Sequence, residues 1–112
     1  MKAIYVAMMA VAGVALAGQA QADEALAKAK NCMSCHAVDK MVVGPAYKDV
    51  AKRYAGKKDA EATLADHIIK GTGPAGAGWQ KEGKAALAIM PPNPTVNADE
   101  AKKLAKWVLA AK

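Results

Sequence analysis

The segment Cys32-Met33-Ser34-Cys35-His36, of the form Cys-x-x-Cys-His, limits what this chain can fold into more than any other feature of its sequence. Two thiols three residues apart on a helical turn face the same side, so each can bond one vinyl group of a haem. The histidine that follows then lies under the porphyrin and can offer an imidazole nitrogen to the iron. The motif predicts one covalently attached haem c, with Cys32 and Cys35 as attachment points and His36 as an iron ligand.

Three other uses of this motif remain open. A thioredoxin-like dithiol needs a βαβ context, and no stretch of this chain alternates like a strand. A zinc site needs four ligands, and the only Cys and His residues are Cys32, Cys35, His36 and His67, at a spacing that fits no common zinc pattern. The cysteines could also form a plain disulfide. A chain with no Phe and only 4% aromatic residues has little bulk for a core, which favours haem as the group that fills the interior.

The first residues have the pattern of a secretory signal peptide. Lys2 is followed by an apolar run over residues 3–17, and the segment ends in Ala20-Gln21-Ala22. The alternative is an uncleaved membrane anchor, but the run is short, rich in Ala and broken by Gly13. We therefore expect a cleaved signal peptide at 1–22 and a single domain at 23–112, exported from the cytoplasm.

The apolar pattern predicts an all-α domain of about four to five short helices wrapped around the haem. None of these helices would be stable alone, so they need a shared core. Gly56 and Gly71 are expected to end two of them. The expected opening helix runs from Asp23 towards Asn31, and the second carries Tyr47, Val50, Ala51 and Tyr54 on one face. The third helix is expected from about Asp59 to Lys70. The last helix is expected to be capped by Asn97 and Glu100 and to carry Leu104, Trp107, Val108 and Ala111 on one face.

The sequence also offers a second iron ligand, Met90. Its Pro-stiffened loop, Met90-Pro91-Pro92-Asn93-Pro94, could hold a thioether rigidly on the face of the haem opposite His36. Met33 lies inside the attachment turn, and Met41 follows His36 too closely to reach that face. The alternative is that Met90 is ordinary core filling.

Two further features do not point to nucleotides or nucleic acid. The stretch Gly71–Gly76 matches Gly-x-Gly-x-x-Gly, but that pattern binds dinucleotides only between a strand and a helix, and here a helical pattern precedes it. The net charge of +6 comes from Lys residues spread along the helices, and an exported chain is not expected to meet nucleic acid.

Taken together, the residues resemble the small bacterial monohaem class I cytochromes c of the c-551/c-552 group. The resemblance covers nearly all of residues 23–112. It is carried by the attachment motif, by Val43–Val50, by Met90–Asn93 and by Leu104–Leu109.

The resemblance implies roles for several residues. His36 and Met90 would be the axial ligands, and the Pro45 carbonyl would accept a hydrogen bond from the far nitrogen of His36. Asn93 would hydrogen-bond near the Met90 sulfur. The first and last helices would cross, with Trp107 in the seam or near the haem.

The chain departs from this family between Trp79 and Met90. Relatives carry a Trp shortly before their Met-Pro-Pro, whereas here Gln80–Ile89 intervene like an insertion. A haem propionate contact of Trp79, and an extra helical turn within the insertion, are therefore open. His67 stands where relatives often carry a basic residue that contacts a propionate; the alternative is a solvent-facing His.

The function that the resemblance implies is that of a periplasmic one-electron carrier, not an enzyme. With both axial positions filled, no substrate would reach the iron. We expect a monomer without stable membrane insertion after signal cleavage. It would bind redox proteins transiently and carry electrons from respiratory-chain donors to a nitrite reductase, a cytochrome oxidase or a peroxidase. The alternative is a ligand-binding sensor or peroxidase-like enzyme with a displaceable Met90.

Overall fold

The computed structural model describes residues 23–74 and 76–111, and the expected signal peptide at 1–22 lies outside these residues. Residues 23–29 are helical. They are followed by the 3-10 helix η1 (Cys32–Ser34), α2 (Tyr47–Tyr54), α3 (Ala60–Lys70) and α4 (Ala98–Leu109). Within the described residues the only β pairing is an isolated bridge between His36 and Met41. The predicted all-α fold is confirmed.

The last helix, α4, begins as its sequence predicts and packs against both α3 and α2. Asn97 Oδ1 accepts from the Glu100 N–H at 2.9 Å, while the Asn97 N–H donates to the Glu100 carboxylate at 3.1 Å, which completes a capping box. Trp107 lies edge-on to Tyr47 of α2, with ring centroids 5.4 Å apart. Because α4 contacts both α2 and α3, the three helices enclose one interior.

That interior is built mostly from small side chains. Ala27, Ala101 and Ala105 are fully buried, and Leu104 is the one large side chain within the described residues that is less than 2% exposed. The opening helix contributes Ala27 to the same cluster as Leu104. A core with so little bulk agrees with the expectation that a further apolar group completes it.

The helix ends fall close to their predicted positions. α3 begins at Ala60, one residue after the expected start, and Gly71 follows its last residue with φ 77°. A side chain is strained at that φ, and a Cβ on Gly71 would also lie 2.7 Å from the Met90 carbonyl oxygen. This glycine therefore ends α3 and lets the Met90 loop approach it.

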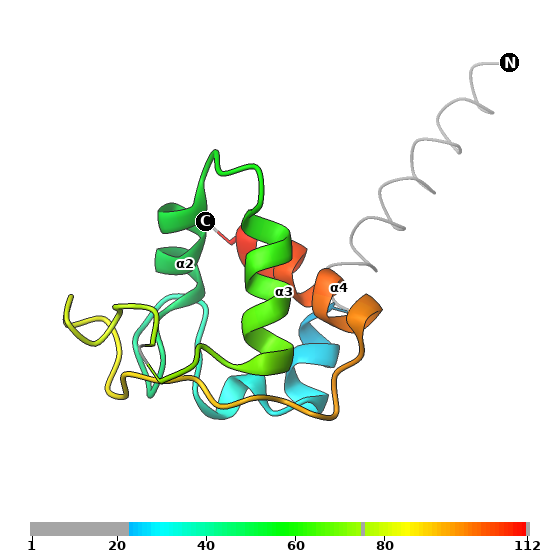
Figure 1. Ribbon diagram of the computed structural model, residues 1–112, viewed down its shortest axis with the longest axis horizontal. Helices are drawn as coiled ribbons and strands as arrows, with labels where there is room; N and C mark the ends of the chain where they lie inside the picture. The colour runs from blue at the N-terminus through cyan, green and yellow to red at the C-terminus, as the bar shows by residue number, and fades with distance from the viewer. Residues whose placement is uncertain (1–22, 75, 112) are drawn as a thin grey trace, which may run out of the picture.

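Between α3 and α4 the chain forms turns and extended stretches, without a helix among the described residues there. Figure 1 shows this part, yellow to orange, projecting beside α2 and then returning beneath α3. The expected insertion, residues 80–89, consists of turns and bends rather than an extra helical turn. Across 23–74 and 76–111, no helix is both long enough and apolar enough to cross a membrane.

Candidate functional site

The Cys-x-x-Cys-His segment forms one tight turn directly after the opening helix. The backbone N–H groups of Cys35 and His36 both donate to the Cys32 carbonyl, at 3.2 and 3.0 Å. Asn31 enters the turn with φ 65°, a conformation that Asn tolerates better than most residues. Both cysteines are free and half-buried, so the disulfide alternative is not what the structure contains.

Tyr47 of α2 contacts this turn from the interior. Its hydroxyl and the Cys32 thiol are close enough to affect each other's pKa. Burial raises the pKa of the Cys32 thiol, an effect that the nearby Tyr47 hydroxyl partly opposes. Burial also raises the pKa of the Tyr47 phenol. Both groups are therefore neutral at neutral pH.

His36 is buried and has one ring nitrogen engaged. Its Nδ1 lies 2.8 Å from the Pro45 carbonyl oxygen. Because a carbonyl only accepts, Nδ1 carries the proton and the lone pair is on Nε2. Burial lowers the pKa of the imidazole, which keeps it neutral. Tyr47 stacks on the ring with centroids 4.8 Å apart. The result is an oriented, neutral imidazole whose Nε2 can bind a metal.

Gly44 makes room for this ring. A Cβ at this position would lie 2.5 Å from His36 Cε1 and 3.0 Å from both ring nitrogens. The hydrogen bond between His36 and Pro45 therefore requires a glycine at position 44, the residue directly before Pro45.

Met90 lies half-buried against the core, and its backbone is fixed at both polar groups. Its N–H donates to Thr72 Oγ1 at 2.9 Å, and its carbonyl accepts from the Thr72 N–H at 3.0 Å. The loop after Met90 is tied to the residue just before the Cys turn, because Asn93 Nδ2 donates to the Lys30 carbonyl at 2.8 Å. The structure thereby brings the Met90 loop and the attachment turn together.

Asn93 makes hydrogen bonds at the end of the opening helix and within its own loop, and the expected bond near the Met90 sulfur stays a prediction. The Asn93 amide donates to Lys30, and its Oδ1 accepts from the N–H and the hydroxyl of Thr95. The physical reason is that the Lys30 carbonyl, at the end of the opening helix, has no partner within that helix. The Asn93 amide supplies this hydrogen-bond donor and so connects its loop to the end of the opening helix.

Trp79 and His67 occupy different surroundings. Trp79 is buried in the core cluster, with the Arg53 guanidinium 3.3 Å from the centroid of its ring. His67 is half-buried in the last turn of α3. A propionate contact for either side chain stays a prediction.

Sequence reasoning missed Gly44 as a steric requirement, Thr72 as the partner of Met90, and Arg53. Only Arg53 left a signal that could have been noticed, since it is the one arginine in the chain. The other two roles depend on contacts between segments far apart in sequence or on a ring orientation.

The residues brought together fit a haem c. Two free thiols lie on one turn, followed by a neutral imidazole with an available Nε2, and a thioether lies on a loop tied to that turn. Within the described part of the chain, no group of three or more His, Cys, Asp or Glu could hold a metal ion. The zinc alternative therefore has no ligand set here.

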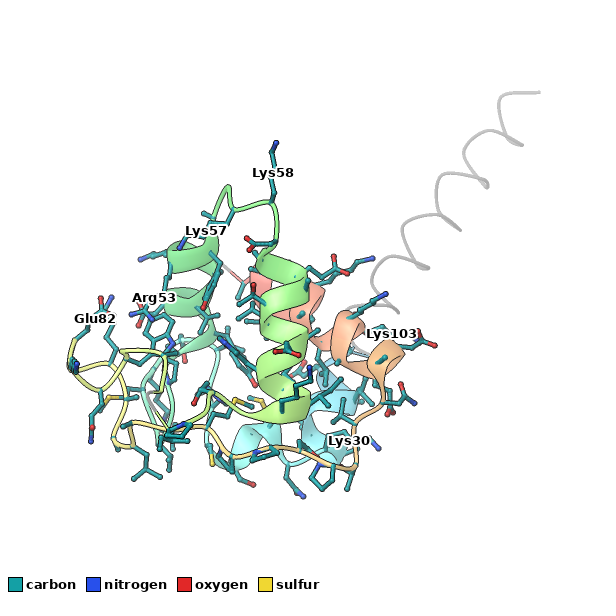
Figure 2. The ribbon with its side chains drawn as sticks, viewed as in Figure 1. Lys30, Arg53, Lys57, Lys58, Glu82 and Lys103 are labelled. Carbon is teal, nitrogen blue, oxygen red and sulfur yellow. The ribbon has the colours of Figure 1, made fainter. Side chains whose placement is uncertain are left out.

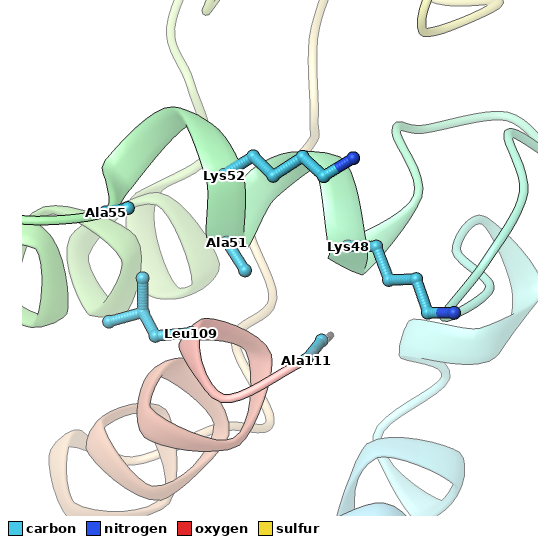
Figure 3. A pocket seen from close by; sticks show the side chains of 6 residues that line it. All are labelled: Lys48, Ala51, Lys52, Ala55, Leu109 and Ala111. Carbon is cyan, nitrogen blue, oxygen red and sulfur yellow. The ribbon is translucent and has the colours of Figure 1, made fainter.

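A hollow of about 410 Å³ lies elsewhere, between α2 and the end of α4 (Figure 3). None of the predicted site residues lines it, so it is separate from the candidate site. Its lining consists of Lys48, Ala51, Lys52, Ala55, Leu109 and Ala111.

Comparison with known proteins gives one consistent family. The family model described as "Cytochrome c" matches residues 16–112. The chain is 45% identical to cytochrome c-552 of Nitrosomonas europaea over the full length of both chains. It is 50% identical to cytochrome c-552 of Hydrogenobacter thermophilus, over 91% of this chain and 94% of that protein. The crystal structure of the Nitrosomonas europaea cytochrome c552 superposes with a TM-score of 0.68 at 43% identity, over 80% of this chain and 99% of that one.

Proposed function

The chain belongs to the cytochrome c family, and on that premise we propose that it is a one-electron carrier whose haem iron is held between His36 and Met90. As a cytochrome c it carries one haem c, attached through Cys32 and Cys35. The observation that carries the proposal is the hydrogen bond from His36 Nδ1 to the Pro45 carbonyl, because it leaves Nε2 free beside the attachment turn.

The chain's own residues set the conditions for this role. Pro45 orients the imidazole and raises its basicity. Thr72 fixes the backbone of Met90, so that the thioether is presented by a restrained loop. A haem with one His and one Met ligand supplies reversible one-electron chemistry at a raised reduction potential. With His36 and Met90 both holding the iron, substrates and small ligands would be kept away from it.

Location and partners form the second part of the proposal. The pattern at 1–22 supports export to the periplasm. Without residues 1–22 the chain loses Lys2, and the remaining net charge of +5 supports steering towards acidic surfaces on redox proteins during brief encounters. The acceptors that suit a carrier of this group are a nitrite reductase, a cytochrome oxidase or a peroxidase, and we propose a monomer that is not an enzyme.

The first test is spectroscopic and compares two methionines. Met90→Ala should abolish the long-wavelength sulfur-to-iron absorption of the oxidised protein and open the iron to carbon monoxide in the reduced protein. Met41→Ala is the matched control, since Met41 is 48% exposed, and it should leave both properties unchanged. An unchanged spectrum in Met90→Ala would refute Met90 ligation. Fast carbon monoxide binding by the unaltered protein would favour the sensor or peroxidase-like alternative.

A further inference from the structure

Arg53, in the last turn of α2, makes three different contacts with the loop that follows α3. Its guanidinium lies over the Trp79 ring, 3.3 Å from the centroid. Its Nη1 donates to the Ala77 carbonyl at 2.7 Å, and its Nη2 pairs with the Glu82 carboxylate. Figure 2 shows Arg53 and Glu82 next to each other where α2 faces this loop. One side chain therefore binds the loop by stacking, by a backbone hydrogen bond and by charge.

A second ion pair, one helical turn earlier, repeats the connection with the charges reversed. Asp49 of α2 lies 3.7 Å from Lys84. Along α2 the order is Asp49 and then Arg53, and along the loop it is Glu82 and then Lys84. If the loop ran in the opposite direction, Asp49 would face Glu82 and Arg53 would face Lys84, and these like charges would repel. The two ion pairs together therefore favour one placement of the loop on α2.

The restraint continues along the chain towards Met90. The Ala86 N–H donates to the Val43 carbonyl at 2.8 Å. Gly76 and Ala88 approach so closely that a Cβ on Gly76 would collide with the Ala88 carbonyl. The loop therefore leaves and returns at nearly the same place, and its return leads directly into Met90.

We infer that Arg53 is a positioning residue for Met90: by fixing residues 77–84 on α2, it limits the movement of the segment that leads into the iron ligand. The inference rests on the proposed function, because it takes Met90 to be the ligand. It also assigns a role to the inserted residues 80–89, which supply both ionic partners, Glu82 and Lys84.

The choice of arginine has a physical reason. A planar guanidinium can stack on an indole ring and still direct separate N–H groups at a carbonyl and a carboxylate. A lysine ammonium is a single point charge and cannot make all three contacts together. The side chain is only 22% exposed, so its charge interactions are less screened than those of a fully solvated residue.

The test measures how often Met90 leaves the iron. Imidazole binds to an oxidised haem of this kind only after the methionine has been displaced, so its binding rate reports that opening. In the haem-loaded protein, Arg53→Gln should raise the rate roughly fivefold to tenfold, the effect expected from losing a cation–π contact and a part-buried ion pair. Arg53→Lys should give an intermediate rate. Lys57→Gln removes the same charge from an exposed residue just after α2 and should match the unaltered protein.

A second measurement needs no haem chemistry. Lys81 is exposed within the loop, and a lysine-specific protease should cleave after it several-fold faster in Arg53→Gln than in Lys57→Gln. If Arg53→Gln does not fold, Glu82→Gln removes only the ion pair from a half-exposed partner and should raise both rates by a smaller factor.

The outcomes separate the two proposals. An unaltered protein without the sulfur-to-iron absorption would overturn Met90 ligation, and the inference with it. If that absorption is present but Arg53→Gln and Lys57→Gln bind imidazole at equal rates, the inference alone is overturned. Faster imidazole binding together with faster cleavage after Lys81 supports it.

Discussion

Thr72 and Met90 exchange two hydrogen bonds: the Thr72 N–H donates to the Met90 carbonyl at 3.0 Å, and the Met90 N–H donates to the Thr72 hydroxyl at 2.9 Å. Thr72 follows Gly71, the glycine that ends α3. The proposed iron ligand is therefore attached to the end of a packed helix rather than to a free loop.

Thr72→Val should weaken this attachment, because it keeps the shape of the side chain but leaves the Met90 N–H without its partner. We expect the free energy of unfolding to fall by about 1 kcal/mol, measured by denaturant titration, and imidazole to bind the oxidised protein faster. Thr72→Ser retains the hydroxyl and serves as the control. Equal imidazole-binding rates in the Val and Ser variants would contradict the role of this hydroxyl.

Gly44→Ala should disturb His36 directly. The new methyl group would lie 2.5 Å from Cε1 of the ring, so the imidazole must move from its hydrogen bond with Pro45. Overpacking of this kind costs about 1–3 kcal/mol, and the haem absorption spectrum should change as well. Gly56→Ala is the comparison: no atom lies within 4 Å of its Cβ, but φ is 77°. It should cost about 1 kcal/mol by backbone strain and leave the spectrum as it was.

His67 carries a separate prediction about the reduction potential. If its side chain lies near a haem propionate, a proton on the imidazole favours the reduced state, and the midpoint potential should fall as the pH rises. Potentiometric titration from about pH 5 to 8 measures this. In His67→Gln the slope should become smaller, and an identical slope in both proteins would exclude His67 as its source.

Much of this protein is readable from local sequence. The Cys-x-x-Cys-His turn, the capping box of Asn97 and Glu100, and the glycine that ends α3 all depend on residues within a few positions of one another. Backbone geometry over such short distances is nearly determined by residue type. The all-α fold and the family could be predicted for the same reason, since the motifs that carry them are short and specific.

The contacts that hold the two ends of the site together belong to the tertiary structure. Asn93 binds Lys30, Thr72 binds Met90, and Arg53 binds the carbonyl of Ala77, 24 positions later. A hydrogen-bond donor in a sequence specifies what it can bind but not which acceptor the fold brings within 3 Å of it. Asn93 illustrates the limit: its residue type indicates that its side chain will make hydrogen bonds, but only the fold shows that the Lys30 carbonyl is an acceptor.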